Sequence, residues 1–133
     1  MSPVETTVYR ITAKLVKTRW VNDPPPSPGK RGGDLDFHLV VQDLNDSTKT
    51  MIVEFPDPPC VHASTKLKRK MTAARTAFIK ACGQPQNGFR NLAGTATITG
   101  VGFFDRPHAD GHALHGIELH PALRFQSTNC HFT

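Results

Sequence analysis

The spacing of the hydrophobic residues changes only twice along the chain, and this constrains the fold more than any other feature of the sequence. Apolar residues alternate with polar ones in three runs, then recur every three or four residues in one run, then alternate again in two more. Alternation is typical of half-buried strands, and the longer spacing is typical of an amphipathic helix. The sequence therefore predicts three strands, one helix and two further strands.

The first three predicted strands cover about 8–21, 34–43 and 50–55. The first is long and bent, because its apolar phase changes near Val16 as a β-bulge would allow. The second and third form a hairpin around the turn-forming segment 43–49, and prolines at 56, 58 and 59 end it. The segment 22–33 holds four Pro and three Gly, so we expect a mobile loop between the first two strands.

The predicted helix covers about 65–82, with Ser64 as its N-cap and Gly83 as its stop. Two strands follow, at about 95–104 and 116–125. This β-β-β-α-β-β order resembles the OB-fold, a five-stranded Greek-key barrel, over about residues 8–125. Residues 1–133 are thus predicted to form a single, β-rich, OB-like domain, with other small one-helix barrels as the alternative.

Composition excludes several classes of protein. With 38% hydrophobic and 20% charged residues the chain is neither disordered nor fibrous, and no run approaches the length of a membrane span. The three cysteines, an odd number without a close pair, indicate a reducing compartment rather than a disulfide scaffold. We therefore expect a cytoplasmic protein, with no membrane partner and with Cys60 and Cys82 as small buried apolar residues.

Titratable side chains share the outer face of the predicted hairpin. Residues of equal parity lie on one face of a strand, so Asp36 and His38 point away from the core, as Glu54 does on the next strand. A turn centred near residue 46 places His38 opposite Glu54. Asp36, His38 and Glu54 can bind a divalent metal or activate a water; the alternative is a solvated sheet face with one favourable cross-strand pair.

A second cluster is rich in histidine, since five of the seven histidines lie in the last 26 residues. Neutral imidazoles with carboxylates suit Zn, Cu, Ni or Fe. The alternative is a polar surface loop whose histidines are incidental, because the stretch contains Pro and Gly and has no standard zinc motif. Together the two clusters predict a divalent metal, Zn first, with these candidate ligands: Asp36, His38, Asp105, His108, His112, His115, Glu118 and His120. The predicted catalytic residues are His38, Glu54 and His120.

Positive charge is concentrated in part of the chain. The net charge is +5, and no acidic residue lies between Asp57 and Asp105. Basic residues and an aromatic one on the first strand are candidate contacts for phosphates and bases: Arg10, Lys14, Lys17 and Trp20. The basic helix has a plainer explanation as a solvated amphipathic surface, and the acidic residues on the hairpin oppose nucleic-acid binding unless a metal neutralises them.

Three strings, Thr50–Pro56 (TMIVEFP), Gly100–Asp105 (GVGFFD) and Gly116–Pro121 (GIELHP), resemble a group of short bacterial proteins. The resemblance covers the last four strands and implies no activity.

Three functions remain open from the sequence. The first is an OB-like module that binds a polar or polyanionic ligand, single-stranded nucleic acid above all. The second is a metal-dependent hydrolase of the phosphodiester type that uses the His/Asp/Glu cluster. The third is an adaptor without chemistry. The oligomeric state is not indicated by the sequence.

Overall fold

The computed structural model describes residues 7–23, 34–57, 64–104 and 117–133. The helix and the five long strands lie within two residues of their predicted bounds, whereas the two short strands, at residues 90–93 and 131–132, were not predicted. The elements in chain order are β1 (Val8–Asp23), β2 (Asp34–Gln42), β3 (Thr50–Phe55), α1 (Thr65–Cys82), β4 (Arg90–Ala93), β5 (Thr95–Phe104), β6 (Ile117–Gln126) and β7 (His131–Phe132).

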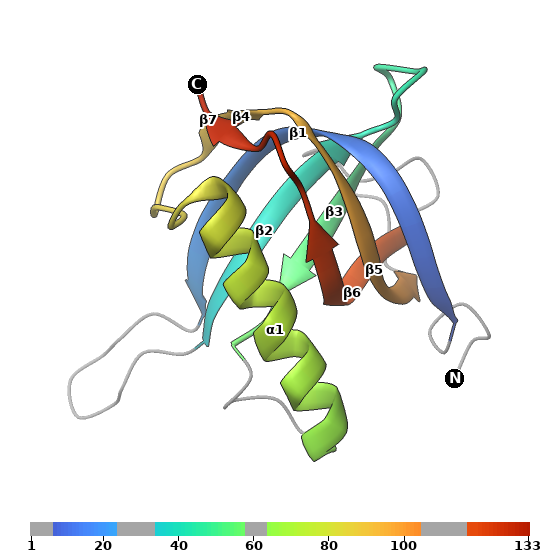
Figure 1. Ribbon diagram of the computed structural model, residues 1–133, viewed down its shortest axis with the longest axis vertical. Helices are drawn as coiled ribbons and strands as arrows, with labels where there is room; N and C mark the ends of the chain where they lie inside the picture. The colour runs from blue at the N-terminus through green and yellow to red at the C-terminus, as the bar shows by residue number, and fades with distance from the viewer. Residues whose placement is uncertain (1–6, 24–33, 58–63, 105–116) are drawn as a thin grey trace.

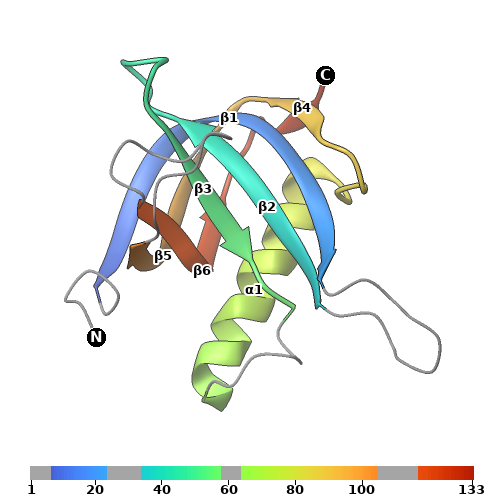
Figure 2. The same cartoon turned by 180° about the vertical axis from the view of Figure 1, so that it is seen from behind.

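The five long strands close into a mixed β-barrel (Figures 1 and 2). Neighbours follow the order β2-β3-β6-β5-β1, and β1 pairs with β2 to complete the circle. The β3–β6 pair is parallel, and the other barrel pairs are antiparallel. The short β4 pairs with β1 and with β7 beside the barrel. This confirms a β-rich barrel with one helix between its third and fourth long strands.

The bulge predicted in β1 is present. The register with β2 shifts between Leu15 and Lys17, and both Leu15 and Thr18 are consequently buried. Thr18 satisfies its hydroxyl by donating a hydrogen bond of 2.8 Å to the carbonyl oxygen of His38 on β2. The bulge therefore keeps one face of a long strand toward the core and the opposite face toward solvent.

A cluster of aromatic rings fills the barrel where α1 packs against it. The Phe78 ring of α1 lies 4.9 Å from Phe55, 5.2 Å from Phe125 and 6.0 Å from Phe37, measured between ring centroids. Figure 1 shows α1 packed at one end of the barrel and extending beyond it. Ser64 is the N-cap of α1, and its side chain accepts a hydrogen bond from the Leu67 N–H. In the described ranges no helix is long and apolar enough to cross a membrane.

Two of the three cysteines form a disulfide. Cys82, at the end of α1, is bonded to Cys130, next to β7. The expectation of unpaired cysteines is wrong for this pair, because the fold joins residues that are 48 positions apart. Cys60 lies outside the described residues, as does most of the predicted mobile loop.

Candidate metal centre

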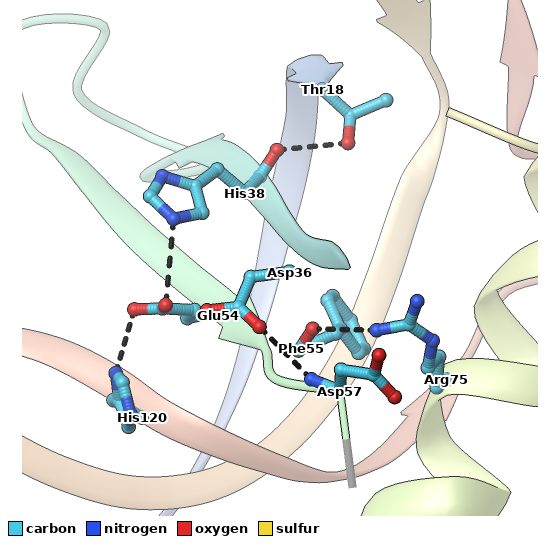
Figure 3. A network of polar contacts seen from close by, with 8 residues as sticks. All are labelled: Thr18, Asp36, His38, Glu54, Phe55, Asp57, Arg75 and His120. Atoms are coloured by element: carbon cyan, nitrogen blue, oxygen red, sulfur yellow. Dashed lines mark hydrogen bonds and ion pairs between the residues drawn. The ribbon is translucent and has the colours of Figure 1, made fainter. Parts of the chain in front are cut away.

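The Glu54 carboxylate lies between two imidazole rings on the outer face of the barrel (Figure 3). Its Oε2 atom is 2.6 Å from Nδ1 of His120, and its Oε1 atom is 3.4 Å from Nε2 of His38. The β2–β3 register pairs His38 with Glu54, as predicted from the hairpin. The parallel β3–β6 register, which aligns Val53 with Leu119, brings His120 to the other side of Glu54.

A second carboxylate completes a group suited to a metal ion. Ligand atoms of Glu54, Glu118 and His120 all lie within 4.8 Å of one another, so these residues can hold a metal. Ligands about 2.1 Å from a shared tetrahedral ion are about 3.4 Å apart, so small side-chain movements convert this group into a first coordination shell. Glu118 is buried although it faces away from the core, because it pairs with Phe103 of β5 and with Ile52 of β3.

The surroundings of the centre lower the pKa of the Glu54 carboxyl and raise the pKa of the His120 imidazole. Burial would raise the pKa of Glu54, but hydrogen bonds from His120 and His38 outweigh it and hold that pKa far below its usual range. Burial would lower the pKa of His120, but the hydrogen bond to Glu54 and the charges of Glu54, Glu118 and Asp36 raise it instead. Nδ1 of His120 is therefore the donor in the bond to Glu54.

The centre is enclosed on one side and open on the other. The Phe103 ring lies 5.7 Å from the His120 ring and covers it on the β5 side. The side chains of His38 and His120 remain 28% and 39% exposed, whereas Glu54 is 12% exposed. A ligand from solvent can thus reach the imidazoles, while the carboxylates sit where solvent screens charge less.

The structure brings together the three predicted catalytic residues, His38, Glu54 and His120, and adds Glu118 from the predicted metal ligands. Asp36 is not part of the Glu54, Glu118 and His120 group. Its Oδ1 atom accepts a hydrogen bond of 2.9 Å from the Asp57 backbone N–H (Figure 3), and its charge acts on His120. The remaining predicted ligands lie outside the described residues: Asp105, His108, His112 and His115.

The predicted phosphate and base contacts on β1 divide between its two faces. Arg10, Lys14 and Lys17 lie on the outer face. Trp20 is half-buried and packs against the hydrophobic core. The Lys17 ammonium lies 4.5 Å from the ring centroid of Phe89, a residue directly before β4 that was not among the predicted contacts.

A separate cavity of about 470 Å³ opens beside the start of β1 and the β2–β3 turn. Ile11, Val41, Thr50 and Met51 are among the residues that line it, and none of the four residues of the centre does. Its lining is mainly apolar and lacks the grouped imidazoles and carboxylates described above. The carboxylate–imidazole centre is therefore the candidate site.

In comparisons with protein-family models, curated proteins and solved structures, nothing matches this chain.

Proposed function

We propose that this protein is a divalent-metal-dependent hydrolase of the phosphodiester type, with Glu54, Glu118 and His120 as the protein ligands. The observation that carries the proposal is the grouping of one imidazole nitrogen and two carboxylates within 4.8 Å on a partly exposed face. Three protein ligands with a position left for water or substrate are typical of catalytic zinc sites. A divalent ion so held acts as a Lewis acid and makes a water molecule more acidic.

The donor set favours zinc as the first candidate. Imidazole suits zinc and the neighbouring transition metals, whereas carboxylates also suit Mg²⁺ and Mn²⁺. His38 serves as a positioning residue in this proposal, because its contact with Oε1 orients the carboxylate whose Oε2 faces His120. A metal ion bound to both Glu54 and His120 would replace the proton that these two residues share. The Glu54–His120 ion pair is therefore the form that the centre takes without metal.

The arrangement of strands supports an OB-type barrel as the scaffold. Strand order β2-β3-β6-β5-β1 and the helix between β3 and the later strands agree with that fold. In OB-folds the face of the second and third strands and the loops beside it bind the ligand. His38 and Glu54 lie on these two strands, so the proposed centre occupies the customary ligand face.

Metal binding is the first test. We expect chelator-treated protein to bind one Zn²⁺ per chain in isothermal titration calorimetry. Glu54→Gln and His120→Gln should lose this binding, and His38→Gln should weaken it about 10- to 100-fold, as loss of an orienting contact does. His131→Gln and Asp46→Asn change an exposed imidazole and a turn carboxylate away from the centre and should bind like the parent. Circular dichroism checks that each variant is folded.

Hydrolysis is the second test, with bis(p-nitrophenyl) phosphate as the probe. Activity should appear with bound Zn²⁺ or Mn²⁺, disappear with chelator and return when metal is restored. Folded parent protein that takes up neither ion would overturn the proposal and favour an adaptor. Stoichiometric binding without cleavage of the probe would restrict the centre to a structural role.

A further inference from the structure

The register of the sheet extends the outer face from the metal centre onto β1. Arg19 is the cross-strand partner of His38, which is in turn the partner of Glu54. Thr18, between the outward residues Lys17 and Arg19, is fully buried. Two cationic side chains therefore lie on the same face as the centre, one strand away from His38.

An exposed aromatic ring lies under both cations. The Lys17 ammonium is 4.5 Å and the Arg19 guanidinium 4.7 Å from the centroid of Phe89, whose residue is 44% exposed. The backbone N–H of Trp20 donates a hydrogen bond of 2.8 Å to the backbone carbonyl oxygen of Gln86, which ties the segment carrying Phe89 to β1. Lys17, Arg19 and Phe89 form what we call the β1 basic patch.

The chain segment that carries Phe89 brings no negative charge to this patch. In the described residues Nε of Arg19 is buried without a hydrogen-bond partner. The stretch that leads from α1 through Phe89 into β5 contains no acidic residue. Such a surface attracts a polyanion, and the ring beside the cations adds a planar apolar platform.

Single-stranded nucleic acid fits this combination better than a duplex. Phosphates bind Lys and Arg, and an unpaired base stacks on an aromatic ring, whereas a duplex keeps its base faces stacked internally. We propose that the β1 basic patch binds single-stranded nucleic acid, with phosphates at Lys17 and Arg19 and a base on Phe89, on a path that leads to the Glu54 centre.

The binding proposal stands on the patch itself. Only its extension, that the bound strand is the substrate of the centre, rests on the proposed hydrolase function. A divalent ion held by Glu54 and Glu118 would offset their charges, so that a strand could continue from β1 over β2 toward β3 without meeting two uncompensated carboxylates.

The experiment measures the affinity of a labelled oligothymidylate by fluorescence anisotropy at low salt, first with chelator and then with Ca²⁺ or Zn²⁺. Phe89→Leu should weaken binding roughly 5- to 100-fold. Phe89→Trp should bind like the parent, because a base stacks on either aromatic ring. Lys17→Gln should weaken binding and reduce the slope of log affinity against log salt concentration by about one. Lys66→Gln removes the same charge from the first turn of α1, away from the patch, and should leave both unchanged.

Three outcomes overturn the inference: no binding under any of these conditions, equal affinity for a duplex of the same length, or equal losses in Lys17→Gln and Lys66→Gln. The last would mean diffuse attraction to net positive charge. If the protein binds the oligonucleotide in chelator but takes up no metal, the hydrolase proposal fails and the patch proposal stands. If it takes up metal but binds no oligonucleotide, the patch proposal fails and the hydrolase proposal stands.

Discussion

At the scale of single residues, the Glu54–His120 pair connects the candidate site to stability. The pKa of His120 is raised on folding, so its stabilising contribution is complete below about 6.5 and is lost as the pH rises through the folded value. The pKa of Glu54 is lowered, so its contribution is present above 4.5 and is lost only in strong acid. The pair therefore stabilises the protein most between pH 4.5 and pH 6.5, the ordinary pKa values of the two groups.

We expect His120→Gln to lower the free energy of unfolding by about 1–2 kcal/mol in that interval, allowing for partial exposure of the ring. The difference from the parent should shrink in alkaline solution, where the imidazole is neutral in both folded and unfolded chains. Urea unfolding in the presence of chelator, repeated across the pH range, measures it. His131→Gln should show no such trend, and a difference of constant size for His120→Gln would contradict the assignment.

Single residues also show where reasoning from sequence succeeds. Alternation along a hairpin is local, so His38 could be placed opposite Glu54 from the strand pattern and the turn. The approach of His120 depends on barrel closure between β3 and β6, which no local pattern encodes. Phe89 could not be predicted for the same reason, because the β1–β4 pairing and the Trp20–Gln86 hydrogen bond that bring it to Lys17 and Arg19 are tertiary contacts. The alternation of basic residues along β1 and the absence of acidic residues between Asp57 and Asp105 were the signals for that surface.

At the scale of elements, glycine controls how β4 turns into β5. Gly94 has φ +102°, and a Cβ there would lie 2.4 Å from the backbone oxygen of Asn129. Its carbonyl oxygen also accepts a hydrogen bond of 2.9 Å from the Leu15 N–H, so the backbone has little freedom to move away. Both the left-handed conformation and the close approach require glycine at this position.

We expect Gly94→Ala to destabilise the protein by about 2–4 kcal/mol, from backbone strain and overpacking together. Gly88→Ala is the matched control, since a Cβ at Gly88 meets nothing within 4 Å. Chemical denaturation of both variants measures the contrast. Equal stabilities would show that the β4–β5 connection relaxes around the added methyl group.

Elements differ in how far their sequence predicts them. The long strands and α1 each span several repeats of the hydrophobic spacing, so this spacing was enough to locate them. β4 and β7, with four and two residues, are too short to display one. Their existence follows from tertiary pairing, in which β4 joins β1 on one side and β7 on the other.

At the scale of the whole molecule, the Cys82–Cys130 disulfide ties α1 to the C-terminal segment. Closing a loop of this length reduces the freedom of the unfolded chain, which corresponds to about 2–4 kcal/mol of stability. The number and spacing of the cysteines could not predict this bond, because the two residues become neighbours only in the folded barrel. A cytoplasmic location remains a prediction from the sequence, and unpaired cysteines no longer support it.

We expect thiol titration of the denatured, unreduced protein to find one reactive thiol among the three cysteines, and reduction to expose all three. Reduced protein, and the Cys130→Ser variant, should unfold at lower urea concentration than the oxidised parent. Three thiols in carefully unreduced protein would mean that the bond does not form.

The parallel pairing of β3 with β6 has a consequence for relatedness. It joins two segments that are 66 residues apart in the chain at the Glu54–His120 contact, so neither segment carries the centre alone. A protein that shares only the hairpin inherits the His–Glu pair without the ligand group, and one that shares only the Glu-Leu-His segment inherits two ligands without the third. Another protein therefore shares this ligand group only if it has both segments, by common descent or by convergence.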